Sequence, residues 1–172
     1  MALFDSDIKN NKPTRKKGYR QGYYRPANPD KYIGDLNKII YRSSYEYRFC
    51  RYCDDSPSIL KWSSEPYGIK YTSPLDGKDH KYYIDFYMRM KDADDNDKEW
   101  DFLVEVKPKE SLKKPIYEGA HTVGKLKNFN YAAKAWLVNS AKFNAAKRHA
   151  ESVGYRFVIV TEDFLFKYEK RK

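Results

Sequence analysis

Phe102-Leu103-Val104-Glu105-Val106-Lys107-Pro108 is an apolar stretch that contains one acid and one base, two positions apart. Side chains alternate across a β-strand, so Glu105 and Lys107 share one face, while Val104 and Val106 point to the opposite face, towards a core. The stretch therefore predicts a strand that holds a carboxylate and an ammonium group side by side.

Asp85 can add a second carboxylate, from a strand predicted at residues 81–90. A carboxylate among the aromatic and aliphatic neighbours of Asp85 is costly unless it is paired or bound to a metal. Two carboxylates offer the oxygen ligands that Mg²⁺ prefers. A lysine beside them can orient a water or stabilise charge on a phosphate under attack. Asp85, Glu105 and Lys107 thus predict phosphodiester hydrolysis, although Glu-Val-Lys alone is more commonly an exposed ion pair.

Length and charge favour one domain with a polyanionic partner. The chain has 172 residues and a formal net charge of +10, which is long enough for a substantial core and basic enough to favour nucleic acid. It contains 17 tyrosines, which could stack on bases but at this density should mostly fill the core. With no apolar run of membrane-spanning length and no signal-peptide pattern, we expect a soluble protein that is not secreted.

The first thirty residues form a region of their own in the sequence. They hold seven basic and three acidic side chains, with interspersed glycine and proline and no periodic apolar face. This composition predicts an extended basic arm over residues 1–30, followed by a folded domain over residues 31–172. The arm could grip DNA or wrap its own domain or a neighbouring subunit. The residues predicted to contact phosphates there are Arg15, Lys16, Lys17, Arg20 and Arg25.

A helix is predicted from Ser43 or Ser44, as its N-cap, to the acidic run that precedes Pro57. Glu46 lies beside the apolar stripe of this helix and could lean into a cleft, or it could be an ordinary solvated glutamate. Cys50 and Cys53 form a CxxC pair, but no second pair completes a zinc site, so we expect ordinary thiols.

The remaining pattern predicts a mixed sheet flanked by helices. Short strands and helices follow one another, and the acidic run at residues 92–99 reads as a polar hairpin loop because it lacks the glycine and glutamate of a calcium loop. The further elements predicted are strands at residues 59–62, 67–71 and 155–161, a helix within residues 122–137, a second helix at residues 141–153 capped by Asn139 or Ser140 and stopped by Gly154, and a short closing helix at residues 162–166.

The order of Glu46 on a helix, Asp85 on a strand and then Glu105-Val106-Lys107 resembles the PD-(D/E)xK nuclease superfamily. The resemblance implies a restriction-endonuclease-like α/β core. It also implies that Asp85, Glu105 and the carbonyl of Val106 hold Mg²⁺, or Mn²⁺ in its place. Lys107 would help to activate the water and Glu46 would join the site. The first motif reads Ile84-Asp85 instead of Pro-Asp, a departure that is frequent in the superfamily.

A closer resemblance covers roughly residues 31 to 163 and is to the head completion nucleases of tailed phages. The segments that carry it, in order, are Tyr41-Arg42-Ser43-Ser44-Tyr45-Glu46-Tyr47-Arg48-Phe49, Trp62-Ser63-Ser64-Glu65-Pro66, Tyr71-Thr72-Ser73-Pro74-Leu75-Asp76-Gly77-Lys78, Tyr83-Ile84-Asp85-Phe86-Tyr87, Val104-Glu105-Val106-Lys107-Pro108, Phe143-Asn144-Ala145-Ala146 and Phe157-Val158-Ile159-Val160-Thr161-Glu162. Transposon-encoded end-cleaving nucleases share much of this layout and are the nearest alternative. The resemblance implies a role late in head assembly, in the host cytoplasm or in the virion head or neck, with phage portal or neck proteins as further partners.

Two functions from different classes follow. The first is an Mg²⁺-dependent DNA endonuclease, in which Arg42, Arg48 and the basic arm neutralise phosphates. Because no base-reading side chains are recognisable, we expect it to prefer DNA structure over DNA sequence. The second is a structural neck or portal component with a nuclease fold, anchored by its basic arm; a DNA-binding protein without catalysis is a weaker third.

Overall fold

The computed structural model describes residues 21–95, 97–119 and 122–170. At its centre lies a four-stranded sheet with the strand order β3-β6-β7-β8. Its strands are β3 (Ile59–Ser64), β6 (Phe86–Lys91), β7 (Glu99–Val106) and β8 (Arg156–Val160). The first three pair antiparallel and β8 runs parallel to β7. The sheet is therefore mixed, as predicted.

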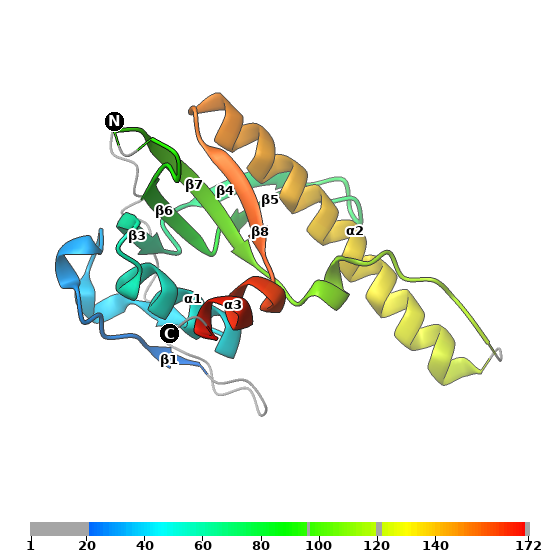
Figure 1. Cartoon of the computed structure of the whole chain (residues 1–172). Coiled ribbons are helices and arrows are strands. Elements are labelled where there is room, and N and C mark those ends of the chain that lie inside the picture. Colours follow the sequence, from blue (N-terminus) through cyan, green and yellow to red (C-terminus); the bar gives the residue numbers. More distant parts are fainter. Residues whose placement is uncertain (1–20, 96, 120–121, 171–172) are drawn as a thin grey trace.

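Helices cover both faces of this sheet (Figure 1). Helix α1 (Ser44–Asp55) and helix α3 (Glu162–Glu169) lie on one face, and helix α2 (Val123–Ser152) lies on the other. The core on the α1 side includes Phe49, Trp62, Phe86, Val104 and Val106. The core on the α2 side includes Tyr82, Ile84, Leu103, Ala146 and Ala150. The predicted α/β architecture with a mixed central sheet and flanking helices is confirmed.

A separate ribbon of β4 (Gly68–Thr72) and β5 (Asp79–Tyr83) packs against α2. The sequence predicted one strand over residues 81–90, and this is wrong: the chain leaves the ribbon at Ile84 and enters the main sheet at Phe86. Ile84 N–H still donates to Tyr67, whereas the carbonyl of Asp85 accepts from Glu65 N–H at 2.9 Å. Asp85 therefore sits at a bend between two sheets.

Helix α2 is one continuous helix, so the prediction of two helices separated by a cap at Asn139 or Ser140 is also wrong. Neither glycine nor proline occurs between Lys125 and Val153, and a single internal Asn-Ser pair does not stop a run of good helix formers. The helix ends as predicted, at Gly154, whose φ of +76° is the left-handed conformation of a C′ glycine.

Helix α1 begins as predicted, since the Ser43 hydroxyl accepts from Glu46 N–H at 3.1 Å. The polar hairpin loop after β6 is confirmed, since β6 and β7 pair antiparallel on either side of it.

The described part of the predicted arm, from Gln21 onwards, packs against the domain. Strand β1 (Gly22–Tyr23) pairs with β2 (Ile40–Tyr41), and Tyr24 is buried in the core beside α1. A 3₁₀ turn at Pro29–Lys31 and another at Leu36–Lys38 complete this N-terminal segment. For these residues the chain wraps its own domain; residues 1–20 lie outside the described part.

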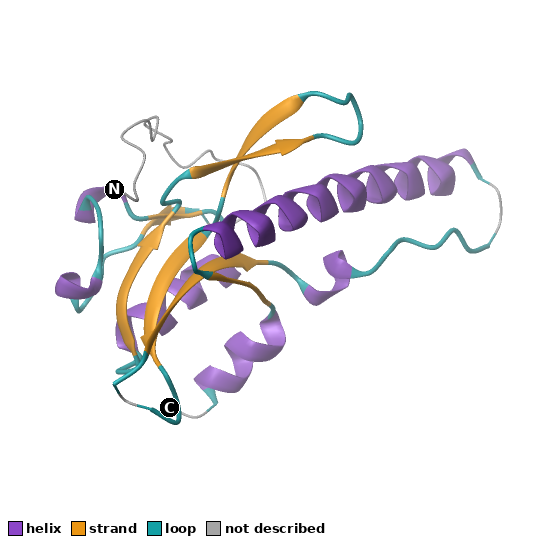
Figure 2. Ribbon diagram, turned by 90° about the horizontal axis from the view of Figure 1, so that it is seen from above, coloured by secondary structure: helices purple, strands orange, loops and turns teal. Residues whose placement is uncertain are grey.

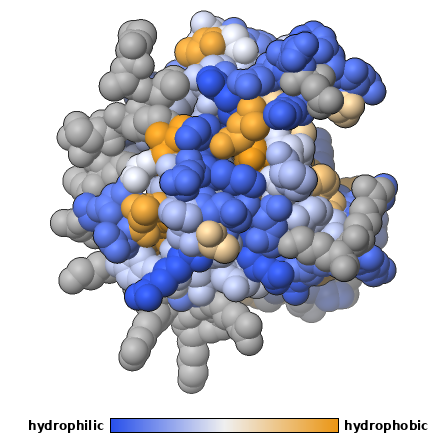
Figure 3. Space-filling model, turned by 60° about the vertical axis from the view of Figure 1, so that its left-hand side comes forward, coloured by the Kyte–Doolittle hydropathy of each residue, from blue (hydrophilic) through white to orange (hydrophobic). Residues whose placement is uncertain are grey.

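The face of the molecule shown in Figure 3 is largely hydrophilic. On the face shown in Figure 3, apolar residues form small and separate areas. Among the described helices, none combines the length and the apolar character that a membrane crossing requires.

Candidate active site

The end of β7 places Glu105 and Lys107 on the face of the sheet that α2 covers. Val104 and Val106 are buried on the opposite face, in the core that contains α1, as the alternation of the strand predicted. Glu105 is only 3% exposed. The Lys107 ammonium nitrogen lies 2.7 Å from Glu105 Oε1. The strand thus holds an ion pair in a largely buried position, unlike an ordinary exposed pair.

Asp85 reaches the same point from the bend between β5 and β6. Its Oδ2 accepts a hydrogen bond from Val106 N–H at 2.8 Å. Lys107 Nζ lies 4.0 Å from the same oxygen. The lysine ammonium therefore lies between two carboxylates, and the predicted trio of Asp85, Glu105 and Lys107 comes together.

The two carboxylates are hard to ionise in this position. Burial raises the pKa of Asp85 to about 7, and the Glu105 charge adds to the effect while Lys107 opposes it. Burial also raises the pKa of Glu105, again opposed by Lys107. Burial by itself would lower the pKa of Lys107, but Asp85 and Glu105 outweigh it and the pKa rises. The arrangement therefore needs cationic charge between the acids.

Glu46 faces this cluster from the first turn of α1. Its carboxylate accepts from Arg42 N–H at 2.7 Å and from the Ser43 hydroxyl at 3.0 Å. Since Ser43 caps the backbone of Glu46 in return, the pair resembles a capping box and also stabilises the helix. Burial raises the pKa of Glu46 to about 7, and the charge of Asp85 contributes. Glu46 thus joins the electrostatics of the site and keeps a structural role.

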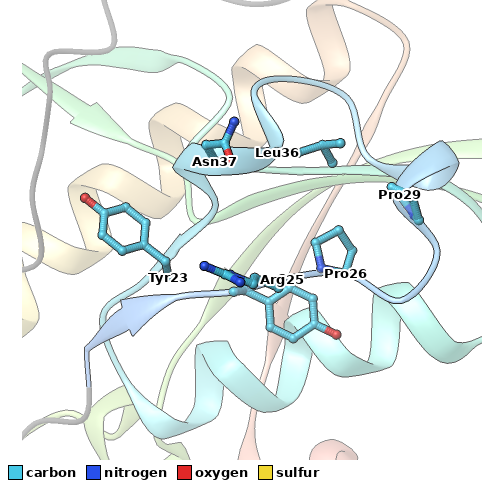
Figure 4. Close-up of a pocket in the computed structure, with 7 residues that line it drawn as sticks. Tyr23, Arg25, Pro26, Pro29, Leu36 and Asn37 are labelled. Atoms are coloured by element: carbon cyan, nitrogen blue, oxygen red, sulfur yellow. The ribbon is translucent and has the colours of Figure 1, made fainter.

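The arginines predicted to contact DNA have different surroundings. Arg42 forms a bidentate ion pair with Glu65, whose second bond is Nη2 to Oε2 at 3.1 Å. Arg48 pairs with Glu169 of α3 and lies 5.1 Å from the Phe166 ring centroid. Arg25 is exposed and lines a pocket in the N-terminal segment (Figure 4). Arg15, Lys16, Lys17 and Arg20 lie outside the described residues.

Glu65 is closer to the site than its sequence position suggested. It has a φ of 44° although it is not glycine and precedes Pro66, a backbone conformation that costs of order 1–3 kcal/mol. Its N–H holds the carbonyl of Asp85 and its charge adds to the raised pKa of Asp85. The strained residue therefore helps to fix the bend that presents Asp85.

Sequence reasoning missed two further residues near the site. Tyr82 of β5 points its hydroxyl towards Glu105, and the charges of Glu105 and Asp85 join burial in raising the pKa of this phenol. Lys142 of α2 lies within electrostatic range of Glu105, Asp85 and Lys107. No local motif marks either residue. Only the packing of α2 and the β4–β5 ribbon over the end of β7 brings them here.

The residues present fit a divalent cation. Within the described residues no three acidic, histidine or cysteine side chains form a ready-made metal cluster. However, Glu105 Oε2 is buried and has no hydrogen-bond partner among them, and an unsatisfied carboxylate oxygen beside a second buried carboxylate is a hard oxygen donor set. Lys107 supplies the positive charge that these acids require in the structure described here.

Comparisons with known proteins identify the family of the chain. Residues 56–162 match the family described as TnsA-like endonuclease N terminal. The matched segment contains Asp85, Glu105 and Lys107 but begins after Glu46. The chain is also similar to the head completion nuclease of Enterobacteria phage T4, with 37% identity over 144 residues, 84% of this chain and 92% of that protein. The chain therefore belongs to the TnsA-like endonuclease family and is a homologue of a phage head completion nuclease.

Proposed function

We propose that this protein is an Mg²⁺-dependent DNA endonuclease, with Mn²⁺ able to replace Mg²⁺. The observation that carries the proposal is the Lys107 ammonium between two largely buried carboxylates, one of which keeps an unpartnered oxygen. A pair of acids with such raised pKa values is costly to the fold, and a buried carboxylate oxygen without a partner requires an explanation, which a bound cation would supply.

In this proposal Asp85, Glu105 and the carbonyl of Val106 hold the cation, which supplies Lewis-acid charge to the phosphate when bound. Lys107 orients the attacking water and stabilises charge that develops on the phosphate. Glu46 completes the acidic cluster from α1. Arg42 lies beside it and, through its pair with Glu65, maintains the bend at Asp85.

The role in the phage is also a proposal. The similarity to a head completion nuclease extends over 92% of that protein, which supports action during head completion or DNA packaging, in the host cytoplasm or in the virion head or neck. We propose DNA as the substrate and portal or neck proteins as further partners. We also propose a preference for DNA structure, such as branches, ends or single-strand junctions.

The test is cleavage of supercoiled, linear and branched DNA by the purified full chain in Mg²⁺, in Mn²⁺ and in EDTA. Glu105→Gln and Lys107→Met are the site variants, and Lys78→Met, an exposed lysine in the β4–β5 turn, is the matched control. The proposal predicts metal-dependent cutting that both site variants lose and the control keeps. Cutting in EDTA, or equal cutting by the site variants, would overturn it. DNA binding without cutting in either metal would favour the structural neck component.

A further inference from the structure

Lys142 occupies an unusual position for a lysine. It lies in the part of α2 that packs against the β4–β5 ribbon and β8 and is half-buried. Its Nζ lies 5.6 Å from the ring centroids of both Tyr71 and Tyr82. Two aromatic rings thus hold the ammonium group through cation–π attraction on the α2 face of the sheet, where Glu105 also lies.

This ammonium group has no carboxylate partner of its own. None of the ion pairs among the described residues involves Lys142. The charges that act on it are those of Glu105, Lys107 and Asp85, while burial lowers its pKa. A half-buried cation that lies within electrostatic range of acidic groups without closing an ion pair keeps its charge available for an anionic ligand.

We propose that Lys142 is a second active-site lysine that contacts a non-bridging oxygen of the phosphate to be cleaved. The inference rests on the nuclease function proposed above and adds a residue to its site. Lys107 extends from the end of β7, whereas Lys142 comes from the helix that covers that end. The two would neutralise the phosphate from different sides. Lys142 forms no covalent bond and exchanges no proton in this role.

The experiment compares Lys142→Met, Lys142→Arg and Lys147→Met in single-turnover cleavage at saturating DNA. Methionine keeps most of the apolar stem that lies on the two rings, and Lys147 is an exposed lysine of the same helix. We expect Lys142→Met to cleave about 100-fold more slowly, as for loss of one charge-stabilising donor. Lys142→Arg should recover much of the rate, and Lys147→Met should equal wild type. Equal rates for Lys142→Met and wild type would overturn the proposal, as would equal losses in Lys142→Met and Lys142→Arg.

Failure of the proposed function would be recognised separately, because wild type itself would then not cut. In that case DNA affinity is measured by fluorescence anisotropy in the Glu105→Gln background. A roughly tenfold weaker Kd with Lys142→Met, but not with Lys147→Met, would still place a phosphate at Lys142. Unchanged affinity would reject the contact altogether.

A second inference comes from the outer half of α2, which projects beyond the sheet together with the segment that leads to it (Figures 1 and 2). We call residues 109–119 and 122–138 the finger. Its two halves are in contact: the rings of Tyr117 and Phe129 lie 5.2 Å apart, and Trp136 Nε1–H donates to the carbonyl of Leu112 at 3.3 Å. The finger is therefore a defined structure with packing of its own.

The charge of the finger is strongly positive. Lys109 pairs with Asp163 and Lys113 pairs with Glu110. Four other lysines have no ion pair among the described residues and are exposed: Lys114, Lys125, Lys127 and Lys134. The finger follows two residues after Lys107, and Lys142 lies further along α2, four residues after the finger ends. Phosphates on either side of a bound scissile group would thus meet this surface.

We infer that the finger holds the DNA backbone beside the cleavage position. The test uses Lys125→Gln/Lys127→Gln/Lys134→Gln in the Glu105→Gln background, which should bind DNA without cutting it. Its control replaces three exposed lysines outside the finger, Lys78, Lys91 and Lys170, by glutamine. We expect the finger variant to reduce the magnitude of the negative slope of log K against log salt by about 2–3, the number of phosphate contacts removed. Equal slopes and affinities for the finger and control variants would refute the inference and favour a protein partner for this surface.

Discussion

Two acidic residues of this protein are buried to nearly the same extent but differ in how the protein satisfies the hydrogen bonding of their carboxylates. Asp54, in the last turn of α1, is fully buried and accepts from Tyr24 OH, Ala27 N–H and Asn28 N–H at 2.7–2.9 Å. Glu105 is 3% exposed, pairs through one oxygen with Lys107, and leaves the other without a partner among the described residues. The first carboxylate is satisfied by the protein, and the second keeps bonding capacity for a ligand.

The difference shows how to separate structural from functional acids. Asp54 fastens the N-terminal segment to α1, since its hydrogen bonds cross to residues 24–28. Asp85 and Glu105 gather like charge around Lys107, which gives a local cost that protonation or a bound cation relieves. Loss of Asp54 should therefore affect stability, and loss of Asp85 or Glu105 should affect activity.

The largest expected effect is the loss of DNA cleavage rate in the Asp85→Asn variant. Removing one of two metal-binding carboxylates should slow DNA cleavage by about 10³-fold, equivalent to several kcal/mol of transition-state stabilisation. The free energy of unfolding should stay equal or rise, because a poorly compensated charge leaves the interior. Cleavage assays and denaturant unfolding measure the two quantities. A variant that keeps full activity would remove Asp85 from the site.

Asp54→Ala should show the reverse pattern. It leaves the Tyr24 hydroxyl and two backbone N–H groups unpaired, so the free energy of unfolding should fall by about 2–4 kcal/mol. Activity per folded molecule should remain that of wild type at a temperature where the variant is folded. A stable Asp54→Ala variant without activity would contradict the contrast between the two acids.

The pH dependence of stability should come from the site. The pKa values of Asp85 and Glu46 rise to about 7 from ordinary values of 3.8 and 4.5. The folded state therefore binds more protons than the unfolded state between these limits. The stability these groups contribute is complete below pH about 4 and is lost as the pH rises through about 7.

The Tm of the metal-free protein should consequently fall between about pH 5 and pH 8, and Mg²⁺ should restore more of it at the higher pH. Differential scanning calorimetry with EDTA or Mg²⁺ checks both. Asp85→Asn should show a flatter profile. A profile of wild-type steepness in that variant would mean that other groups govern the pH dependence.

The smallest expected effect is a difference in the free energy of unfolding between phenylalanine variants of two buried tyrosines. Tyr24→Phe removes one donor to Asp54 and should lower the free energy of unfolding by about 1 kcal/mol. Tyr82→Phe removes a hydroxyl that points towards Glu105 but forms no hydrogen bond of normal geometry among the described residues, so stability should change by less than in Tyr24→Phe. Denaturant unfolding of both variants tests the pair, and equal destabilisation would show that Tyr82 has a structural partner.

Much of the fold was predictable from local chemistry. The alternation around Glu105, the Ser43 cap and the Gly154 stop all act within a few residues, and each was confirmed. The two errors concern elements that tertiary context decides. The break at Asp85 exists because β5 pairs with β4 while β6 pairs with β3 and β7, and α2 continues through Asn139 and Ser140 because nothing there stops it.

The candidate site was predictable only where residues occur in a recognisable order. Asp85, Glu105, Lys107 and Glu46 could be selected from spacing and from the resemblance to known nucleases. Lys142 could not be selected, because long-range packing brings it to the site. Glu65 could be considered as a further acid, but an ordinary strand-end residue before Pro66 was the stronger interpretation, because only a backbone bend brings it to Asp85. The structural role of Asp54 was also not predictable, because the sequence shows it only as part of a polar helix end, whereas its hydrogen-bond partners lie near the start of the chain.

The most direct test of the account is calorimetric titration of the full chain with Mg²⁺ at pH 7, in two buffers of different ionisation enthalpy. We predict one class of site whose occupation releases protons, because acids with raised pKa values must ionise to bind the cation. Asp85→Asn and Glu105→Gln should abolish this binding, and Asp54→Asn should retain it. Binding that survives in both site variants, or that is lost in Asp54→Asn while the protein stays folded, would contradict the central claim.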